Sequence, residues 1–253
     1  MAASMMRFAE VCDAVAGTTR KNEKVSLVSE YLRSLSVDDA ARAALFLTAR
    51  AFSRSEERVL AVGGSIVWRA LSRLVKVEGG DLEATYRKHG DLGDMTEEVL
   101  NAAGHSSPAA GLTLGEVEAA FQQLAGRRGP AQKQSLLEEL LRRARPQEAK
   151  YLVKVLTGEL RIGLKESLVE EAIALAFSQP LGDVQRANMF TGNIPATVRL
   201  AATGALATVS LHLFHPVSFM LASPADTSEE MAGSFPQGAL VEDKFDGVRA
   251  QVH

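Results

Sequence analysis

The sequence predicts a mainly α-helical domain over residues 1–205, followed by the beginning of an α/β domain over residues 206–253. Helical apolar periodicity, with recognisable start and stop residues, covers most of the first part. In the second part Val209, Leu211 and Leu213 recur at every second position, which is typical of a strand. At 253 residues, 46% of them hydrophobic, the chain can bury one full core and part of a second.

The first helix is predicted from Phe8, Val11, Cys12 and Val15, which fall at i, i+3, i+4 and i+7 and so share one face. Gly17 follows and is placed to end this helix in the left-handed conformation that glycine adopts readily. The chain is therefore expected to begin with an amphipathic helix.

Capping patterns predict later helix starts. Ser36 and Asp39 have the spacing of a capping box, with Asp in place of the usual Glu, before an apolar-rich run over residues 40–52. Thr113 with Glu116 is a fuller version of the same box. Each pattern marks the first turn of a helix.

Prolines and glycines mark further helix ends. Pro130 and Pro146 suit the first turn, where a missing N–H removes no hydrogen bond. Gly158, Gly192 and Gly204 each follow an apolar-periodic segment and are interpreted as stops. Most of residues 1–205 thus divides into helices of ordinary length.

The C-terminal part is expected to fold differently. A short helix is predicted over residues 228–232, then strands over residues 239–244 and 248–253 joined by a turn at 245–247. So few strands are not stable alone, and we expect the sheet either to continue beyond residue 253 or to lean on the helical domain.

Positive charge is concentrated in one stretch, although the net charge is −3. From Arg127 to Lys165 there are ten Lys or Arg residues against four Glu, a local charge of +6. One interpretation is a set of solvated helix faces, and the other is a surface that contacts phosphates. Charge alone leaves both open.

Composition favours an intracellular protein. The one cysteine, Cys12, has no partner for an internal disulfide, and Arg7 and Glu10 interrupt the only apolar stretch near the start. Gly204 and Pro216 break the longest later apolar segment, so we expect no membrane span. We also expect a monomer.

The segment most suggestive of chemistry runs from Glu242 to Arg249 and includes Lys244, Asp246 and Gly247. A lysine nucleophile needs help near neutral pH, where a free lysine is neutral only about once in a few thousand. Positive charge nearby favours the neutral amine and offsets charge that develops on a phosphate. Gly247 permits a tight turn that brings Lys244 and Arg249 together.

This segment resembles the nucleotidyltransferase signature, a lysine, any residue, Asp-Gly, and an arginine two residues later. The bare pattern is also that of an ordinary hairpin turn, so its surroundings decide the interpretation. Met220-Leu221-Ala222 resembles the opening of the adenylation domain in ATP-dependent DNA ligases, with Phe219 where that family has proline. Ala250-Gln251-Val252-His253 resembles the continuation found there.

The resemblance to the ATP-dependent DNA ligase family implies roles for three residues. Lys244 would attack the α-phosphate of ATP and carry AMP, Glu242 would orient the adenine, and Arg249 would contact the ribose or phosphate. The implied cofactors are ATP and Mg²⁺, with the metal ligands expected mostly beyond residue 253. We expect none of the named residues to bind metal.

Two segments of the helical part resemble the loops with which the family approaches DNA. They are residues 90–93, with Gly90 and Gly93, and residues 160–165, with Arg161, Gly163 and Lys165. Glycine lets backbone amides come close to phosphate oxygens, and the two cations add charged contacts. The alternative is that these glycines only cap or link helices.

The function implied is sealing of nicks in duplex DNA through a lysine-AMP intermediate, in replication, repair or recombination. An alternative of another class is a DNA-binding fragment that catalyses nothing by itself. A third, an RNA ligase or capping-type nucleotidyltransferase, shares the lysine motif, but the long helical domain speaks against it.

Overall fold

A computed structural model of the chain describes residues 2–56, 58–76, 79–107, 111–212, 217 and 225–243. The described residues are mainly helical, and their only β pairing is an isolated antiparallel bridge between Ser4 and Thr113. The helices are α1 (Met5–Ala16), α2 (Lys21–Arg33), α3 (Val37–Leu47), α4 (Gly64–Val75), α5 (Gly79–His89), α6 (Leu92–Ala102), α7 (Leu114–Gly126), α8 (Pro130–Arg143), α9 (Pro146–Thr157), α10 (Glu166–Ala176), α11 (Leu181–Thr191), α12 (Ile194–Thr203), the 3-10 turn η1 (Leu206–Thr208) and α13 (Ser228–Ser234).

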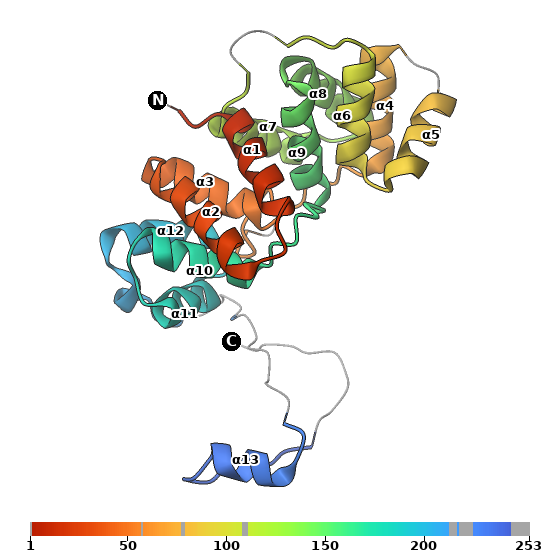
Figure 1. Cartoon of the computed structure of the whole chain (residues 1–253). Coiled ribbons are helices and arrows are strands. Elements are labelled where there is room, and N and C mark those ends of the chain that lie inside the picture. Colours follow the sequence, from red (N-terminus) through yellow and green to blue (C-terminus); the bar gives the residue numbers. More distant parts are fainter. Residues whose placement is uncertain are drawn as a thin grey trace.

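Helices α1 to α12 form two groups that share one core (Figure 1). In the first group α10 packs on α2 and α12 packs on α3, and in the second α6 packs on α9 and α4 packs on α8. Helix α1 joins the groups because it packs on both α2 and α9. The predicted helical domain is confirmed.

Local signals explain where several helices start. Ser36 caps α3 by accepting from the Asp39 N–H at 3.2 Å. Thr113 and Glu116 form both bonds of the predicted capping box, at 3.2 and 2.9 Å. Pro130 and Pro146 begin α8 and α9, as predicted.

Glycine stops follow the prediction at three of four positions. Gly158, Gly192 and Gly204 end α9, α11 and α12 with φ of 75°, 55° and 70°. The left-handed end predicted at Gly17 is wrong, because Gly17 has φ −71° and its N–H donates to the Asp13 carbonyl oxygen. There the chain leaves α1 by continuing a right-handed turn.

The helical unit extends past the expected boundary at residue 205. Leu206 and Val209 are buried in its core, and Arg186 donates to both of their carbonyl oxygens at 3.4 Å. Val209 therefore packs on the helices instead of beginning a sheet. The domain division at 205 stays a prediction, but the packed helical part includes four more residues.

The expected strands are not found among the described residues of the C-terminal part. Residues 209–212 and 239–243 have no strand partner. The remainder of these two predicted strands, and all of the third over residues 248–253, lie outside the described residues. The predicted short helix is present as α13, capped by Thr227, and buries none of its residues. An α/β domain is therefore not seen in the described part.

Aromatic side chains fill the centre of the core. Phe8 meets Phe46 and Tyr151 edge to face, with ring centroids 6.1 and 6.5 Å apart, and Phe46 meets Phe121 at 5.6 Å. These contacts tie α1, α3, α7 and α9 together. No helix among the residues described here has the length and apolar character needed to cross a membrane.

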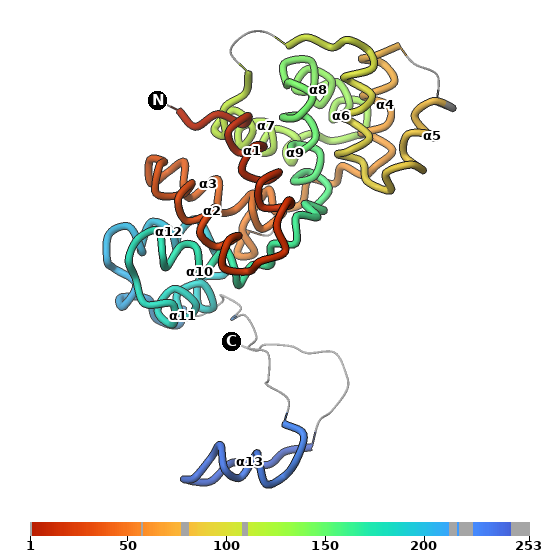
Figure 2. The backbone as a smooth tube through the Cα atoms, viewed as in Figure 1, coloured from red at the N-terminus to blue at the C-terminus, as the bar shows by residue number. Residues whose placement is uncertain are grey.

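The backbone crosses between the two groups twice (Figure 2). The α3–α4 loop (residues 48–56 and 58–63) leads from the first group to the second, and the α9–α10 loop (residues 158–165) leads back. The hypothetical Cβ of Gly158 would lie 3.7 Å from the Ala49 carbonyl oxygen, so the two crossing loops are neighbours.

Candidate nucleic-acid interface

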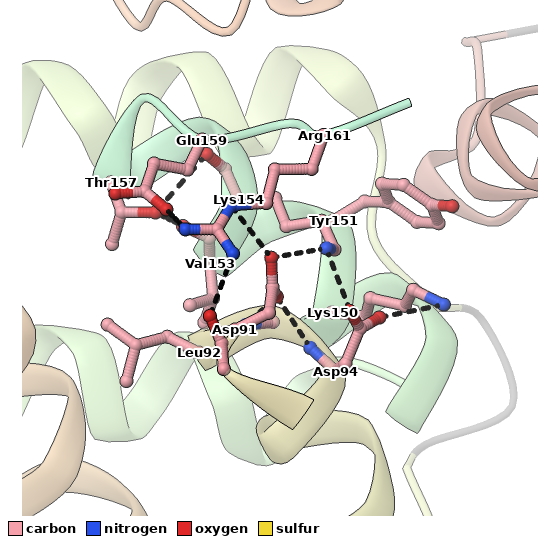
Figure 3. Close-up of polar contacts among 12 residues, drawn as sticks. Asp91, Leu92, Asp94, Lys150, Tyr151, Val153, Lys154, Thr157, Glu159 and Arg161 are labelled. Carbon is pink, nitrogen blue, oxygen red and sulfur yellow. Dashed lines mark hydrogen bonds and ion pairs between the residues drawn. The ribbon is translucent and has the colours of Figure 1, made fainter. Parts of the chain in front are cut away.

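The two glycine-containing segments predicted from the sequence meet in space, although about 70 residues separate them. Arg161 Nη1 donates to the Gly90 carbonyl oxygen at 2.7 Å. Arg161 Nε lies 3.7 Å from the Asp91 carboxylate, and Figure 3 shows Asp91 between the side chains of Arg161 and Lys154. The α5–α6 loop (residues 90–91) and the α9–α10 loop therefore form one surface.

The buried Asp91 connects the α5–α6 loop to α9 beneath this surface. It caps α6 by accepting from the N–H groups of Gly93 and Asp94 at 2.8 and 2.9 Å. Its other oxygen lies 2.7 Å from Lys154 Nζ, and both side chains are only 5% exposed. The buried ion pair fixes the start of α6 against α9.

Gly93 has a packing role at this junction. A Cβ there would lie 2.5 Å from Lys154 Cγ and 2.7 Å from the Lys150 carbonyl oxygen. The Gly93 residue is buried, and its N–H is already bonded to Asp91. The structure therefore offers no direct phosphate contact at Gly93, whereas Gly90 is exposed with φ 61°.

The α9–α10 loop has an unusual backbone. Arg161 and Gly163 have φ of 51° and 63°, and both are exposed. Such a conformation is strained for arginine and requires support from the surroundings. Beneath the loop, Lys24 Nζ donates to the Ile162 and Gly163 carbonyl oxygens at 2.6 and 3.2 Å.

Lys165 completes this loop. It is exposed, occupies the N-cap position of α10, and has no acidic partner among the described residues. Its ammonium is therefore available to solvent at the start of a helix. The structure thus brings Gly90, Arg161, Gly163 and Lys165 onto two adjoining loops, and Gly93 lies under them.

Two further loops extend the same surface. Ser55 N donates to the Gly192 carbonyl oxygen at 3.2 Å, and Asn193 Nδ2 donates to Ser55 Oγ at 3.3 Å. Arg54 Nη2 lies 2.7 Å from Glu166 in the first turn of α10. The α3–α4, α5–α6, α9–α10 and α11–α12 (residues 192–193) loops thus adjoin, and we refer to them as the loop face.

Helices α4, α6, α10 and α12 all begin at the loop face. The first N–H groups of a helix lack partners inside it, and the helix dipole places partial positive charge there. Anions bind at such ends for both reasons. The side chains of Asp91 and Asn193 already accept from the first N–H groups of α6 and α12, whereas no side chain caps α4 or α10. The N-termini of α4 and α10 are therefore the helix ends of the loop face that are suited to negatively charged groups.

A hollow of about 480 Å³ lies within this face, between the α3–α4 loop and the end of α9. Arg50 and Arg58 contribute to its lining. Burial and the neighbouring Arg54 lower the pKa of Arg50, because both disfavour its charge. An anion in the hollow would relieve that repulsion.

The basic stretch from residue 127 to 165 does not form one exposed patch. Lys133 and Lys154 are buried, and Arg143 pairs with Glu116. Lys150 contacts Asp94 at 3.2 Å and two other carboxylates. Much of the local charge of +6 is therefore either buried, as at Lys133 and Lys154, or paired with carboxylates of other helices.

The predicted nucleotide residues cannot be placed together. Glu242 is exposed, while Lys244 and Arg249 lie outside the described residues. Their roles remain predictions, and the geometry of an ATP site is not defined by the residues described.

Sequence reasoning missed several residues of the loop face. Arg50, Arg54 and Ser55 belong to a loop that the apolar pattern suggested was partly helical, and Lys24 lies on a helix far away in sequence. The run of arginines at positions 50, 54 and 58 after an apolar helix was a usable signal. Nothing local to Lys24 indicated that it supports a distant loop.

The fold and the site together define a class: a helical domain that presents loops and helix N-termini suited to phosphate on one face. Comparison with known families gives that class a name, because residues 4–174 match the family described as DNA ligase N terminus. The chain belongs to this family.

Curated relatives agree with the family match. The chain is 51% identical over 249 residues to a probable DNA ligase of Koribacter versatilis, with 98% of this chain and 43% of the relative covered. It is 34% identical to a probable DNA ligase of Opitutus terrae, covering 99% and 31%. It is 32% identical to a DNA ligase of Methanopyrus kandleri, covering 97% and 45%. The chain thus spans less than half the length of these relatives.

Proposed function

We propose that this chain is the DNA-binding part, with the start of the adenylation part, of an ATP-dependent DNA ligase that acts inside the cell on nicked duplex DNA. The observation that carries the proposal is the contact between Arg161 and the Gly90 carbonyl. It joins two loops that separately resemble the family's DNA-contacting segments. The names of the relatives support the same activity.

The loop face provides the binding surface in this proposal. Helix N-termini and the cations Arg161 and Lys165 contact phosphates of the duplex, and Arg161 does so by exchanging its exposed ion pair with Glu159 for a phosphate. Such contacts position a protein without reading sequence. Binding is therefore expected to tolerate any DNA sequence and to weaken steeply with salt. We propose that the protein acts as a monomer.

We also propose the residues that carry out catalysis. ATP supplies the AMP group, Lys244 is the nucleophile, and Glu242 and Arg249 hold the nucleotide. Mg²⁺ is included on the ground of the family resemblance alone. We propose that residues from about 206 onward begin the adenylation domain, as the motif around Lys244 indicates.

A labelling experiment tests the assignment. A version of the protein extended to the length of its relatives is incubated with α-labelled ATP and Mg²⁺, and Lys244→Ala is compared with the unchanged protein. We expect covalent label only on the unchanged protein and nearly equal duplex affinity for both, because the lysine contributes one bond and one charge. Label that persists on Lys244→Ala would refute the role of this lysine.

The present chain separates the binding-module alternative from the enzyme. If it shifts nicked duplex but takes no label, it functions as a DNA-binding module and depends on further residues for catalysis. If it labels efficiently, the residues it contains are already sufficient for nucleotide transfer.

A further inference from the structure

Two buried lysines support two different loops of the loop face in the same way. Lys24 on α2 donates to the Ile162 and Gly163 carbonyl oxygens, at 2.6 and 3.2 Å. Lys133 on α8 donates to the Leu60 and Ala61 carbonyl oxygens, at 2.5 and 3.5 Å. Each lysine is 7% exposed.

The arrangement is reciprocal between the two groups of helices. Lys24 lies on α2 in the first group, and the crossing loop that leaves this group after α3 is held by Lys133. Lys133 lies on α8 in the second group, and the crossing loop that leaves this group after α9 is held by Lys24. Each group thus supplies one loop and the lysine beneath the other group's loop.

Neither lysine has a carboxylate partner among the described residues, and carbonyl oxygens are their only acceptors there. Burying a cation is costly unless its charge is compensated. Carbonyl dipoles supply part of the compensation. A phosphate on the outer side of the loop would supply more, because the ammonium lies just beneath it.

The lysines also determine which way the loop amides point. In a trans peptide the C=O and N–H groups point in opposite directions, so carbonyls turned toward a buried lysine turn their amides away from it. For Lys24 these are the N–H groups of Gly163 and Leu164, and for Lys133 those of Ala61 and Val62. None of the four has a hydrogen-bond acceptor among the described residues.

Each loop also has a residue in a strained backbone conformation in or next to the peptides that its lysine binds. Ala61 has φ 47° and Arg161 has φ 51°, both in the left-handed region that only glycine adopts without strain. At Gly163, with φ 63°, a Cβ would lie 2.7 Å from Lys24 Nζ, so a side chain there would displace the ammonium from its carbonyl acceptors. Successive outward amides of this kind form concave sites for anions.

We propose that Lys24 and Lys133 are positioning residues, each of which holds two successive backbone amides of a loop outward as a phosphate subsite. The subsite over Lys133, at Ala61 and Val62, is additional to the segments that the sequence singled out. This inference rests on the proposed function, because the phosphates are those of duplex DNA.

The first test compares Lys24→Met and Lys133→Met with controls on the same helices. Val28→Ala and Leu137→Ala remove buried apolar side chains four residues further along the same helices, which cannot donate a hydrogen bond to the loops. The affinity for a nicked duplex oligonucleotide is measured by anisotropy at one salt concentration, together with the melting temperature. We expect each Met variant to bind about tenfold or more weakly, as loss of a charge-assisted contact implies. The controls should lose melting temperature but keep their affinity.

A second pair keeps the proposal testable if a Met variant does not fold. Gly163→Ala places a methyl group where the Lys24 ammonium lies and so separates the lysine from the loop, whereas Gly204 has a similar positive φ, at 70°, with nothing within 4 Å of a Cβ. Both variants carry similar backbone strain. We expect weaker DNA binding for Gly163→Ala alone.

The outcomes separate this inference from the proposed function. If the unchanged chain does not bind duplex DNA, the proposed function fails and the inference fails with it. If the unchanged chain binds, but the Met variants and Gly163→Ala bind as tightly as their controls, only the inference is overturned.

Discussion

Lys154 Nζ lies 2.7 Å from the carboxylate of Asp91, and both side chains are almost fully buried. The lysine belongs to α9 and the aspartate caps α6, so the pair connects the two helices that pack most extensively in the second group. Lys154 also reaches Asp94 at 3.1 Å. The pair determines where the α5–α6 loop sits relative to Arg161.

Removing one member of this pair should destabilise the fold strongly. Lys154→Met leaves the buried Asp91 with only the more distant Arg161, at 3.7 Å, to offset its charge, and breaking a buried ion pair typically costs about 3–5 kcal/mol. The free energy of unfolding is measured with urea. Glu83→Ala breaks the exposed Arg87–Glu83 pair on α5 and serves as control, with an expected loss of about 0.5 kcal/mol or less. Equal losses for both variants would contradict the structural role of the buried pair.

The cations of the α9–α10 loop should contribute to DNA affinity through phosphates. Replacing Arg161 and Lys165 by alanine should flatten the log-log salt slope by roughly two units, since each phosphate contact contributes about −0.9. Affinity should fall equally for all sequences. Arg7 and Arg199, which lie outside the loop face, provide a double-alanine control. An unchanged slope in the loop variant would place the DNA-binding surface elsewhere.

Gly93 should tolerate no side chain. Gly93→Ala brings a Cβ within 2.7 Å of the Lys150 backbone oxygen, which cannot move away without shifting α9. We expect a loss of about 1–3 kcal/mol, as overpacking typically costs. Gly115→Ala in α7 has open space at its Cβ and should be neutral or slightly stabilising. Both values come from urea unfolding, and a neutral Gly93→Ala would show that α6 and α9 can separate freely.

Acid should destabilise the domain through carboxylates that pair with cations. Burial tends to raise the pKa of Asp94, but hydrogen bonds from Lys154 and Lys150 outweigh it and lower that pKa. A hydrogen bond from Arg143 lowers the pKa of Glu116. Groups with depressed pKa values stabilise the fold above their unfolded values, near 4, and that stability is lost as pH falls further.

The measurement is the free energy of unfolding between pH 7 and pH 3. It should change little down to about pH 5 and then decline. Asp94→Asn should have a lower free energy of unfolding at pH 7. Its free energy of unfolding should also decline less between about pH 5 and pH 3, because the stabilisation that comes from the charged Asp94 is already absent. A variant curve parallel to that of the unchanged protein would show that Asp94 does not contribute.

The helical framework could be predicted because its signals are local. Thr113 and Glu116 lie three residues apart, and Gly158 follows its helix directly, so each is visible without tertiary structure. Gly17 could not be predicted in the same way. Its φ depends on where the chain must go next, which is decided by packing.

The site was only partly predictable for a different reason. Arg161 and Gly90 were recognised by resemblance, but their contact depends on how α6 packs on α9. Lys133 and Lys154 counted as surface charge in the sequence, and their burial depends on partners 73 and 63 residues away. Counting charges along the sequence does not reveal which residues will contact these lysines in the fold.

The reciprocal support of the crossing loops affects how the loop face forms during folding. Because the loop that continues α3 is held by a lysine of α8, and the loop that continues α9 by a lysine of α2, neither half of the helical domain can complete its own part of the surface. A half that has just been synthesised, or that has been cut from the other half, would contain a crossing loop but not the lysine that holds it. If the proposed function holds, the ability to bind DNA would therefore appear late in folding, at the step in which the two halves dock, and a partly folded chain would not bind DNA.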